Sequence, residues 1–231
     1  MKKYFTLLAA VSFILPVSAA TLRVNNTPGS GAQYTTFADA EQAAADGDVI
    51  IVDGSNKSYD KITISKKITV KGPGFFLDAN NNVGEGAMPA TFNEVTIVAE
   101  GATVTGLYVD GDIYLQNNNI VVNRCYASNI YHSKSYSYSQ EAISNCIIHQ
   151  NFIRYSIKGD SYSKAATLFQ VTNNIFSDPS NACIYNLDKA RICHNTIVPR
   201  YGSKVGKLSN CVIENNICPL STPEILTRAT H

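Results

Sequence analysis

The sequence predicts an all-β protein whose chain winds as a parallel β-coil, each turn adding one rung to a solenoid. The first observation is a repeat: four similar segments end at Asn151, Asn174, Asn195 and Asn216, and an earlier copy ends at Cys125. The second is the interval between copies, 21 to 26 residues, which is typical of solenoids. The third is the alternation of apolar and polar residues inside each copy, which indicates strands.

Each repeat is expected to contain a short strand before its asparagine. The positions three and five residues upstream are apolar in every copy, whereas the position between them is mixed. This period of two places one side of the strand in the core, and a helix would not produce it. The two core columns are Val122, Ile148, Val171, Ile192 and Ile213, and Ile120, Cys146, Phe169, Ala190 and Cys211.

The asparagines predict the corner of each rung. Asparagine tolerates positive φ and bonds to nearby backbone groups, so it suits a sharp turn. Copies stacked about 4.8 Å apart can pass amide hydrogen bonds from one rung to the next. We therefore expect an internal ladder followed in each rung by a second short strand. The members of the ladder are Cys125, Asn151, Asn174, Asn195 and Asn216.

The repeat loosens toward the N-terminus without disappearing. Residues 62–70 read as two alternating strands around a polar corner, and residues 102–109 fit the repeat with Gly106 and Leu107 at the corner. Residues 36–47 read as a short helix that Thr36 begins and Gly47 can end. Such a helix would cover the exposed first end of the solenoid.

Two segments near this end resemble a known family. Residues 36–54 read TFADAEQAAADGDVIIVDG and residues 62–72 read ITISKKITVKG, which is similar to the opening of right-handed parallel β-helix proteins of the pectin-lyase-like superfamily. The resemblance covers nearly all of the chain after residue 20. It implies the right-handed fold and no particular activity, because the superfamily contains lyases, hydrolases, esterases and adhesins.

The chain is expected to be one exported domain. Met1-Lys-Lys, an apolar stretch and the small-residue site Val17-Ser-Ala19 are typical of a bacterial secretory leader, too short to span a membrane. We expect a secreted, periplasmic or cell-surface location. The near balance of 19 basic and 18 acidic residues argues against a nucleic-acid partner. The expected parts are a signal peptide at 1–20 and a β-helix domain at 21–231, with an N-terminal cap at 21–54, coils at 55–220 and a C-terminal tail or cap at 221–231.

Six cysteines in an exported chain suggest disulfides, but their columns argue against most pairs. Cys146 and Cys211 share a column three rungs apart, about 14 Å, whereas a disulfide needs Cα atoms within about 7 Å. Most of the cysteines are therefore expected to be small buried hydrophobic residues. Only a bridge between Cys183 and Cys193 stays open.

The sequence contains none of the catalytic motifs of the superfamily. The paired aspartates and Gly-His-Gly of polygalacturonases are missing, the esterase pattern is missing, and the absence of tryptophan excludes the Trp-Ile-Asp-His of pectate lyases. The catalytic residues, if any, are unknown. Asp110 and Asp112 flank Gly111 in what we expect to be a polar turn; the alternative is a Ca²⁺ site. No other cofactor or metal is expected.

One surface feature indicates binding. Tyrosines and basic residues are frequent in the segments expected to be return loops, and stacked loops would form a band on one side of the solenoid. Tyrosine suits sugar rings, and Lys or Arg can meet carboxylate or sulfate. The alternative is an ordinary polar surface. The predicted binding residues are Arg154, Tyr155, Lys158 and Tyr162 after Asn151, and Arg200, Tyr201 and Lys204 after Asn195.

These observations favour a non-catalytic β-helix that binds a glycan or another cell-surface macromolecule through its lateral surface. The first alternative is a polysaccharide-active enzyme, a lyase on uronate-containing polymers more than a glycoside hydrolase. The second alternative is a structural or adhesive module. The missing motifs favour the binding protein and the structural module over the enzyme.

Overall fold

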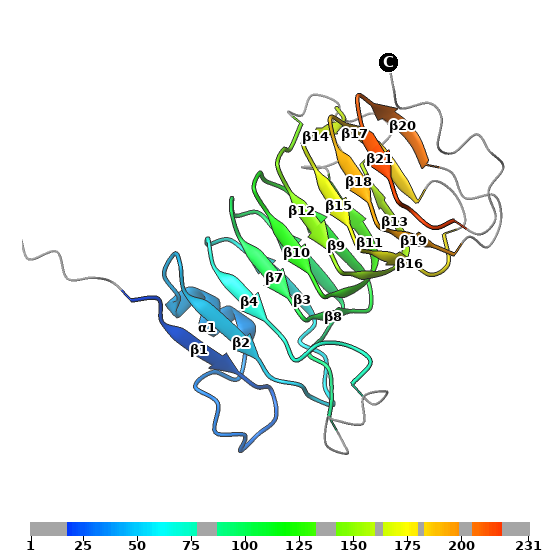
Figure 1. Cartoon of the computed structure of the whole chain (residues 1–231). Helices are drawn as coiled ribbons and strands as arrows, with labels where there is room; N and C mark the ends of the chain where they lie inside the picture. The colour runs from blue at the N-terminus through cyan, green and yellow to red at the C-terminus, as the bar shows by residue number, and fades with distance from the viewer. Residues whose placement is uncertain are drawn as a thin grey trace, which may run out of the picture.

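The structure is a computed structural model that describes residues 18–77, 87–132, 142–159, 164–179, 183–198 and 205–218. In this part of the chain the predicted right-handed parallel β-helix is confirmed, with one short helix at its N-terminal end (Figure 1). Most of the expected signal peptide and all of the expected C-terminal tail lie outside the described residues.

Sheet A is a file of short parallel strands that runs the length of the solenoid. Its members pair residue by residue with the strands before and after them, and no described strand in it is antiparallel. In order they are β1 (Thr21–Val24), β2 (Val49–Val52), β4 (Thr69–Lys71), β7 (Thr103–Thr105), β10 (Val121–Asn123), β12 (Ile147–His149), β15 (Gln170–Thr172), β18 (Arg191–Cys193) and β21 (Val212–Glu214).

Sheet B closes the coil and has two walls that share two long strands, β11 (Tyr126–Tyr131) and β13 (Phe152–Lys158). The narrow wall contains the first residues of these strands together with β5 (Thr91–Phe92), β8 (Tyr108–Val109), β16 (Ile175–Phe176) and β19 (Thr196–Ile197). The broad wall contains their last residues together with β3 (Lys61–Ile64), β6 (Glu94–Ile97), β9 (Asp112–Leu115), β14 (Ala166–Thr167), β17 (Ile184–Asp188) and β20 (Val205–Ser209).

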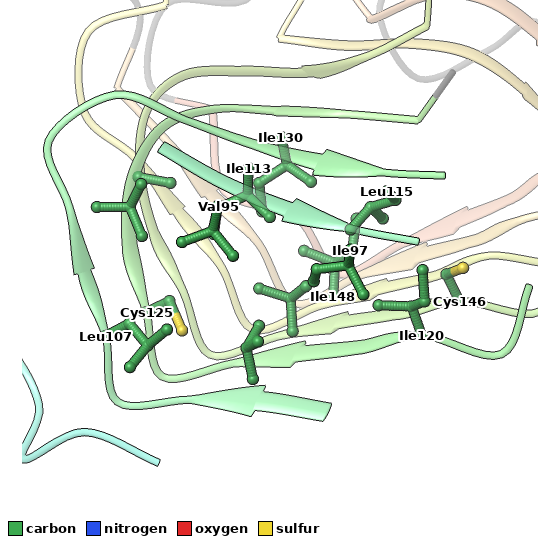
Figure 2. Packing of buried hydrophobic residues seen from close by; sticks show 14 of the residues in the cluster. Val95, Ile97, Leu107, Ile113, Leu115, Ile120, Cys125, Ile130, Cys146 and Ile148 are labelled. Atoms are coloured by element: carbon green, nitrogen blue, oxygen red, sulfur yellow. The ribbon is translucent and has the colours of Figure 1, made fainter. Parts of the chain in front are cut away.

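The core lies between sheet A and the two walls of sheet B. The column predicted three residues before each asparagine stands in register, because Val122, Ile148, Val171 and Ile192 pair successively along sheet A and are buried. Figure 2 shows residues of the broad wall pointing toward Ile120 and Ile148 of the sheet A side, with Leu107 and Cys125 at the corner. Those broad-wall residues are Val95, Ile97, Ile113, Leu115 and Ile130.

The asparagine ladder is also confirmed. The side-chain oxygen of Asn174 accepts hydrogen bonds from the backbone N–H and from Nδ2 of Asn151, at 2.9 and 3.0 Å. Asn195 does the same for Asn174, and Asn216 for Asn195. At the N-terminal end of the ladder the backbone N–H of Cys125 donates to the side-chain oxygen of Asn151. The cysteine therefore continues the file although it has no side-chain amide.

The prediction that the ladder residue adopts positive φ is wrong by one position. The left-handed residue is the one just before the ladder: Gly106, Arg124, Gln150, Asn173, His194 and Asn215 have φ between 50° and 68°. This residue makes the turn, and the ladder amide then points inward, where its Nδ2 satisfies a carbonyl of the preceding rung, as Asn174 does for Ile148. Asparagine is selected here for its side-chain amide and not for its backbone.

The N-terminal end is closed by two devices. Helix α1 (Phe37–Ala43) begins at Thr36, whose side chain accepts from the N–H of Asp39 as predicted, and it buries Phe37 against Phe92. The helix ends at Ala43, so Gly47 lies beyond it in the turn before β2. The outer edge of β1 is covered separately, because Tyr34 pairs with the backbone of Arg23.

All six cysteines are free thiols, so the disulfide between Cys183 and Cys193, which the sequence left undecided, does not form. Cys125, Cys146 and Cys211 are buried as predicted, and Cys183 and Cys193 are buried as well. Cys218, which was also expected to be buried, is only half-buried. Burial raises the pKa of Cys125 and of Cys183 to about 12, and that of Cys146 to about 11. These three thiols are therefore protonated and act as core residues.

Candidate binding surface

The most irregular feature of the lateral surface is a bulge in β13. Ala127 of β11 pairs with Ile153, but Asn129 pairs with Ser156, so β13 holds one residue more than β11 across this interval. The extra length carries Arg154 and Tyr155. A bulge bends the strand and re-aims its side chains, and bulges are common beside binding sites.

The bulge lies at the junction of the two walls of sheet B and presents a cation. The Arg154 side chain is exposed, and its guanidinium carbon lies 4.9 Å from the ring centroid of Tyr155. No carboxylate of the described residues forms an ion pair with Arg154. The site therefore offers a positive charge that rests on an aromatic ring and forms no ion pair with a described carboxylate.

An aromatic cluster on the narrow wall adjoins the bulge. Tyr108, Tyr126 and Phe152 stack along the solenoid axis, with ring centroids 4.4 and 5.6 Å apart. Phe76, from the loop after β4, packs edge-on against Phe152 at 5.0 Å, and its own side chain is 50 % exposed. The stacked rings cover one another's faces and show mainly their edges to solvent, whereas Phe76 keeps half of its surface open.

A second stack runs along the broad wall. Tyr114, Tyr131, Lys158 and Tyr185 occupy one outward column in register. The rings of Tyr114 and Tyr131 are stacked at 5.2 Å, and the Lys158 ammonium lies 5.3 Å from the centroid of Tyr131. The facing sides of Tyr114 and Tyr131 are thus used within the column.

A row of polar side chains lies beside this stack. Asn129 donates from Nδ2 to Asp112 at 2.8 Å, and Ser156 donates to Asn129 at 2.7 Å. The second Asp112 oxygen accepts from the Tyr114 hydroxyl at 3.4 Å. Both oxygens of Asp112 are therefore engaged, and the described residues contain no group of three or more His, Cys, Asp or Glu side chains around it or Asp110 that could hold a metal ion.

Three of the predicted binding residues fall in the described part of the chain, and the structure places them together. Arg154, Tyr155 and Lys158 lie on β13, so the expectation that they occupy a return loop is wrong. They are strand residues because Ile153, Ser156 and Ile157 are buried in the wall between them. The other four predicted residues, Tyr162, Arg200, Tyr201 and Lys204, lie outside the described residues.

The electrostatics of the aromatic cluster connect it to the bulge. Burial raises the pKa of the Tyr108 hydroxyl, and the neighbouring Tyr126 and Asp110 raise it further. The charge of Arg154 acts on the same hydroxyl in the opposite direction. Charges of both signs, that of Arg154 and that of Asp110, therefore act on the Tyr108 hydroxyl at the rim of the cluster. Neither pKa effect creates a general base near neutral pH.

His132 is the described histidine with the strongest perturbation, and it is not placed for chemistry. Its ring is 2 % exposed, packs against Phe169 and bonds the carbonyl of Tyr185 through Nε2 at 2.9 Å. Burial lowers its pKa to about 4, so the imidazole is neutral at neutral pH. Because the ring is enclosed, it has no access to a ligand on the lateral surface.

An open hollow of about 610 Å³ lies on another part of the solenoid, at the corner where the broad wall returns to sheet A. Its charged residues, Asp46, Lys67 and Glu100, are of both signs, and none of the predicted binding residues lines it. The side chain of Asn119 already donates to Glu100 at 2.6 Å. The hollow shows no convergent set of groups comparable with the bulge.

Sequence reasoning missed Tyr108, Tyr114, Tyr126, Asn129 and Phe152 as members of this surface. The signal was present: several of them stand one position from inward residues that repeat from rung to rung. Tyr114, for example, follows the buried Ile113, as Tyr131 follows Ile130. Reading outward columns as carefully as inward ones would have found both stacks.

Comparisons with known proteins add no assignment to this surface. No family model matches the chain, and neither the curated proteins nor the solved structures include a match. Among the described residues, no helix has the length and apolar character that crossing a bilayer requires.

Proposed function

We propose that this protein is an exported β-helix that binds an acidic glycan of a cell surface or extracellular matrix at the β13 bulge. The observation that carries the proposal is the bulge itself, which turns Arg154 outward over Tyr155 at the edge of an aromatic cluster, where it forms no ion pair with a described carboxylate. A carboxylate or sulfate would meet the guanidinium, and a sugar ring would lie against the open surface of Phe76.

The geometry supports binding better than catalysis. Hydrolysis of a glycosidic bond usually needs two carboxyl groups about 5 to 10 Å apart. Near the bulge the described carboxylates are Asp110, Asp112 and Asp178; the backbone N–H of Asp178 donates to the carbonyl of Arg154. The carboxylate of Asp112 is held by Asn129 and Tyr114. The neutral His132 is enclosed in the core. These features favour a binding protein over the lyase or hydrolase alternative.

We also propose that the chain is a distant member of the pectin-lyase-like superfamily. Support comes from the resemblance of residues 36–54 and 62–72 to the opening of those proteins, and from the parallel walls and asparagine ladder that follow. The secretory leader expected at the N-terminus supports export from a bacterial cell. The sequence contains no enzymatic motif of the superfamily, so this membership carries no activity.

Binding to a panel of acidic and neutral polysaccharides tests the function. We expect the wild-type protein to bind acidic polymers, with an affinity that falls as salt rises. Arg154→Ala should weaken binding by about tenfold, because it removes a charge-assisted hydrogen bond worth about 1.5 kcal/mol or more. Lys158→Ala should have a smaller effect, since its ammonium already lies over Tyr131.

Lys71→Ala is the matched control, because Lys71 is an exposed lysine on the outer side of sheet A, away from the bulge. It changes the net charge as Lys158→Ala does and should leave the affinity unchanged. Equal losses of affinity in Lys71→Ala and Arg154→Ala would show that binding depends on the overall charge of the protein and not on the bulge. Unsaturated sugar products, detected by ultraviolet absorbance with uronate polymers, would replace the binding proposal with the lyase alternative.

A further inference from the structure

The start of the folded solenoid coincides with the expected leader cleavage point. The expected leader boundary at residue 20 is refined here by one position, because the small-residue site Val17-Ser-Ala19 places the cut between Ala19 and Ala20. Strand β1 then begins one residue later, at Thr21. Residues 18–20 are exposed, so the bond is accessible to a peptidase. The position of Ala20 is set by the rung, because its carbonyl accepts from the N–H of Val49 at 2.9 Å.

The backbone nitrogen of Ala20 points at a buried carboxylate. It donates to Asp48 Oδ1 at 2.7 Å, while the N–H of Ala45 donates to Oδ2 at 2.8 Å. Asp48 is only 6 % exposed, although it stands in a turn at the surface of the first rung. These backbone hydrogen bonds, first that of Ala45 and then that of Ala20, lower the pKa of Asp48. The carboxylate is therefore ionised at neutral pH.

No side-chain cation of the described residues forms an ion pair with Asp48. The charge of Lys66 also lowers the pKa of Asp48, but the Lys66 ammonium donates to the carbonyls of Gln42 and Ala44 at the end of α1. Asp46, in the same turn, accepts from the backbone of Lys67. A largely buried anion thus meets only neutral donors while Ala20 is part of a peptide bond.

We propose that leader removal completes this site: hydrolysis of the Ala19–Ala20 bond converts the Ala20 amide into an α-ammonium that forms an ion pair with Asp48. The reaction is a hydrolysis by an export peptidase. It consumes one water, leaves a carboxylate on Ala19 and, after proton uptake, an ammonium on Ala20. A charge-assisted hydrogen bond is about twice as strong as a neutral one. Processing thereby stabilises the first rung in the mature protein only.

The first test is the N-terminus of the protein exported with its own leader, read by mass spectrometry, which should begin at Ala20. The second compares purified chains that begin at Ala20 and at Ser18. The Ala20 form should melt about 2 to 4 °C higher at pH 7, the shift that corresponds to about 1 kcal/mol in a domain of this size. This difference should disappear at high pH, where the α-amino group is neutral.

Two matched variants separate the ion pair from a change in chain length. Asp48→Asn should remove the difference between the two forms, because it leaves a neutral acceptor. An Ala20 form acetylated on its α-nitrogen keeps an N–H without the charge and should melt like the Ser18 form. This acetylated form provides the test if Asp48→Asn does not fold. A mature chain that begins at Thr21 or elsewhere overturns the proposal, and so do equal melting temperatures of the Ala20, acetylated and Ser18 forms.

Discussion

The same corner of the coil is built in two ways in the two halves of the solenoid. In the N-terminal half it is made by Gly106 and the apolar Leu107, which is fully buried. In the C-terminal half a non-glycine residue makes the turn, and a buried amide takes the place of Leu107. The backbone path is equivalent, because Thr105 and Asn123 pair just before the two corners.

The two solutions differ in what stabilises the stacking of rungs. A Cβ on Gly106 would lie 2.6 Å from the carbonyl oxygen of Gly72, so the N-terminal corner depends on close backbone approach. The C-terminal corner is linked by side-chain hydrogen bonds through Asn151, Asn174 and Asn195. The first corner is intolerant of added volume, and the second is intolerant of lost hydrogen-bonding groups.

The largest effect is expected from Asn174→Ala in the middle of the ladder. The substitution leaves the N–H and Nδ2 of Asn151 without their acceptor, and it removes the Nδ2 donor of the Ile148 carbonyl. Each buried group left unsatisfied costs about 1 to 3 kcal/mol, so we expect a loss of about 4 kcal/mol in the free energy of unfolding by urea.

Asn216→Ala is the graded control for the ladder. Asn216 is half-buried and accepts from Asn195 at the last described rung, so its loss should destabilise by about half as much. An unfolding midpoint of Asn174→Ala equal to that of the wild type would show that the amides do not hold the rungs together.

A smaller effect is expected from Gly106→Ala at the N-terminal corner. An L-residue at φ 68° costs about 1 to 2 kcal/mol, and the close approach to Gly72 adds overpacking of about 1 kcal/mol or more. We expect destabilisation of about 3 kcal/mol. Gly31→Ala isolates the backbone effect, because Gly31 has φ 74° and its Cβ would meet open space. Equal losses in the two variants would remove the close contact from the explanation.

The two corners also show why the fold was predictable and part of its geometry was not. The inward columns repeat in the sequence because the core imposes apolar residues at a period of two. The turn position keeps no single residue type: it is Arg124, Gln150, Asn173, His194 and then Asn215. Without glycine as a marker, the sequence pointed to the asparagine that follows, which is held for its side chain.

The candidate surface was found only in part for a related reason. Alternation in residues 152–158 is broken by the bulge, so a seven-residue strand reads as a loop. Arg154, Tyr155 and Lys158 were recognised by residue type alone. Phe76 joins the cluster from a loop far away in sequence, and no local pattern predicts that contact. Register within a rung can be predicted from sequence, whereas contacts between a loop and a wall require the structure.

The smallest effect concerns the opposite corner, where the broad wall returns to sheet A. Here too left-handed residues recur: Asn119 and Asn145 occupy two successive rungs, and Leu168 the next, with φ 57° and 53 % exposure. Asparagine adopts this conformation more readily than leucine, and Asn145 already donates to Asn119 at 2.6 Å. Leu168→Asn should therefore raise the free energy of unfolding by about 0.5 to 1 kcal/mol. Leu168→Ala, which keeps the strain, should give no gain. A lower unfolding midpoint in Leu168→Asn would mean that the leucine side chain stabilises this corner by packing. The turn would then depend on side-chain volume, as the corner at Gly106 does, and not on amide hydrogen bonds, as the ladder does.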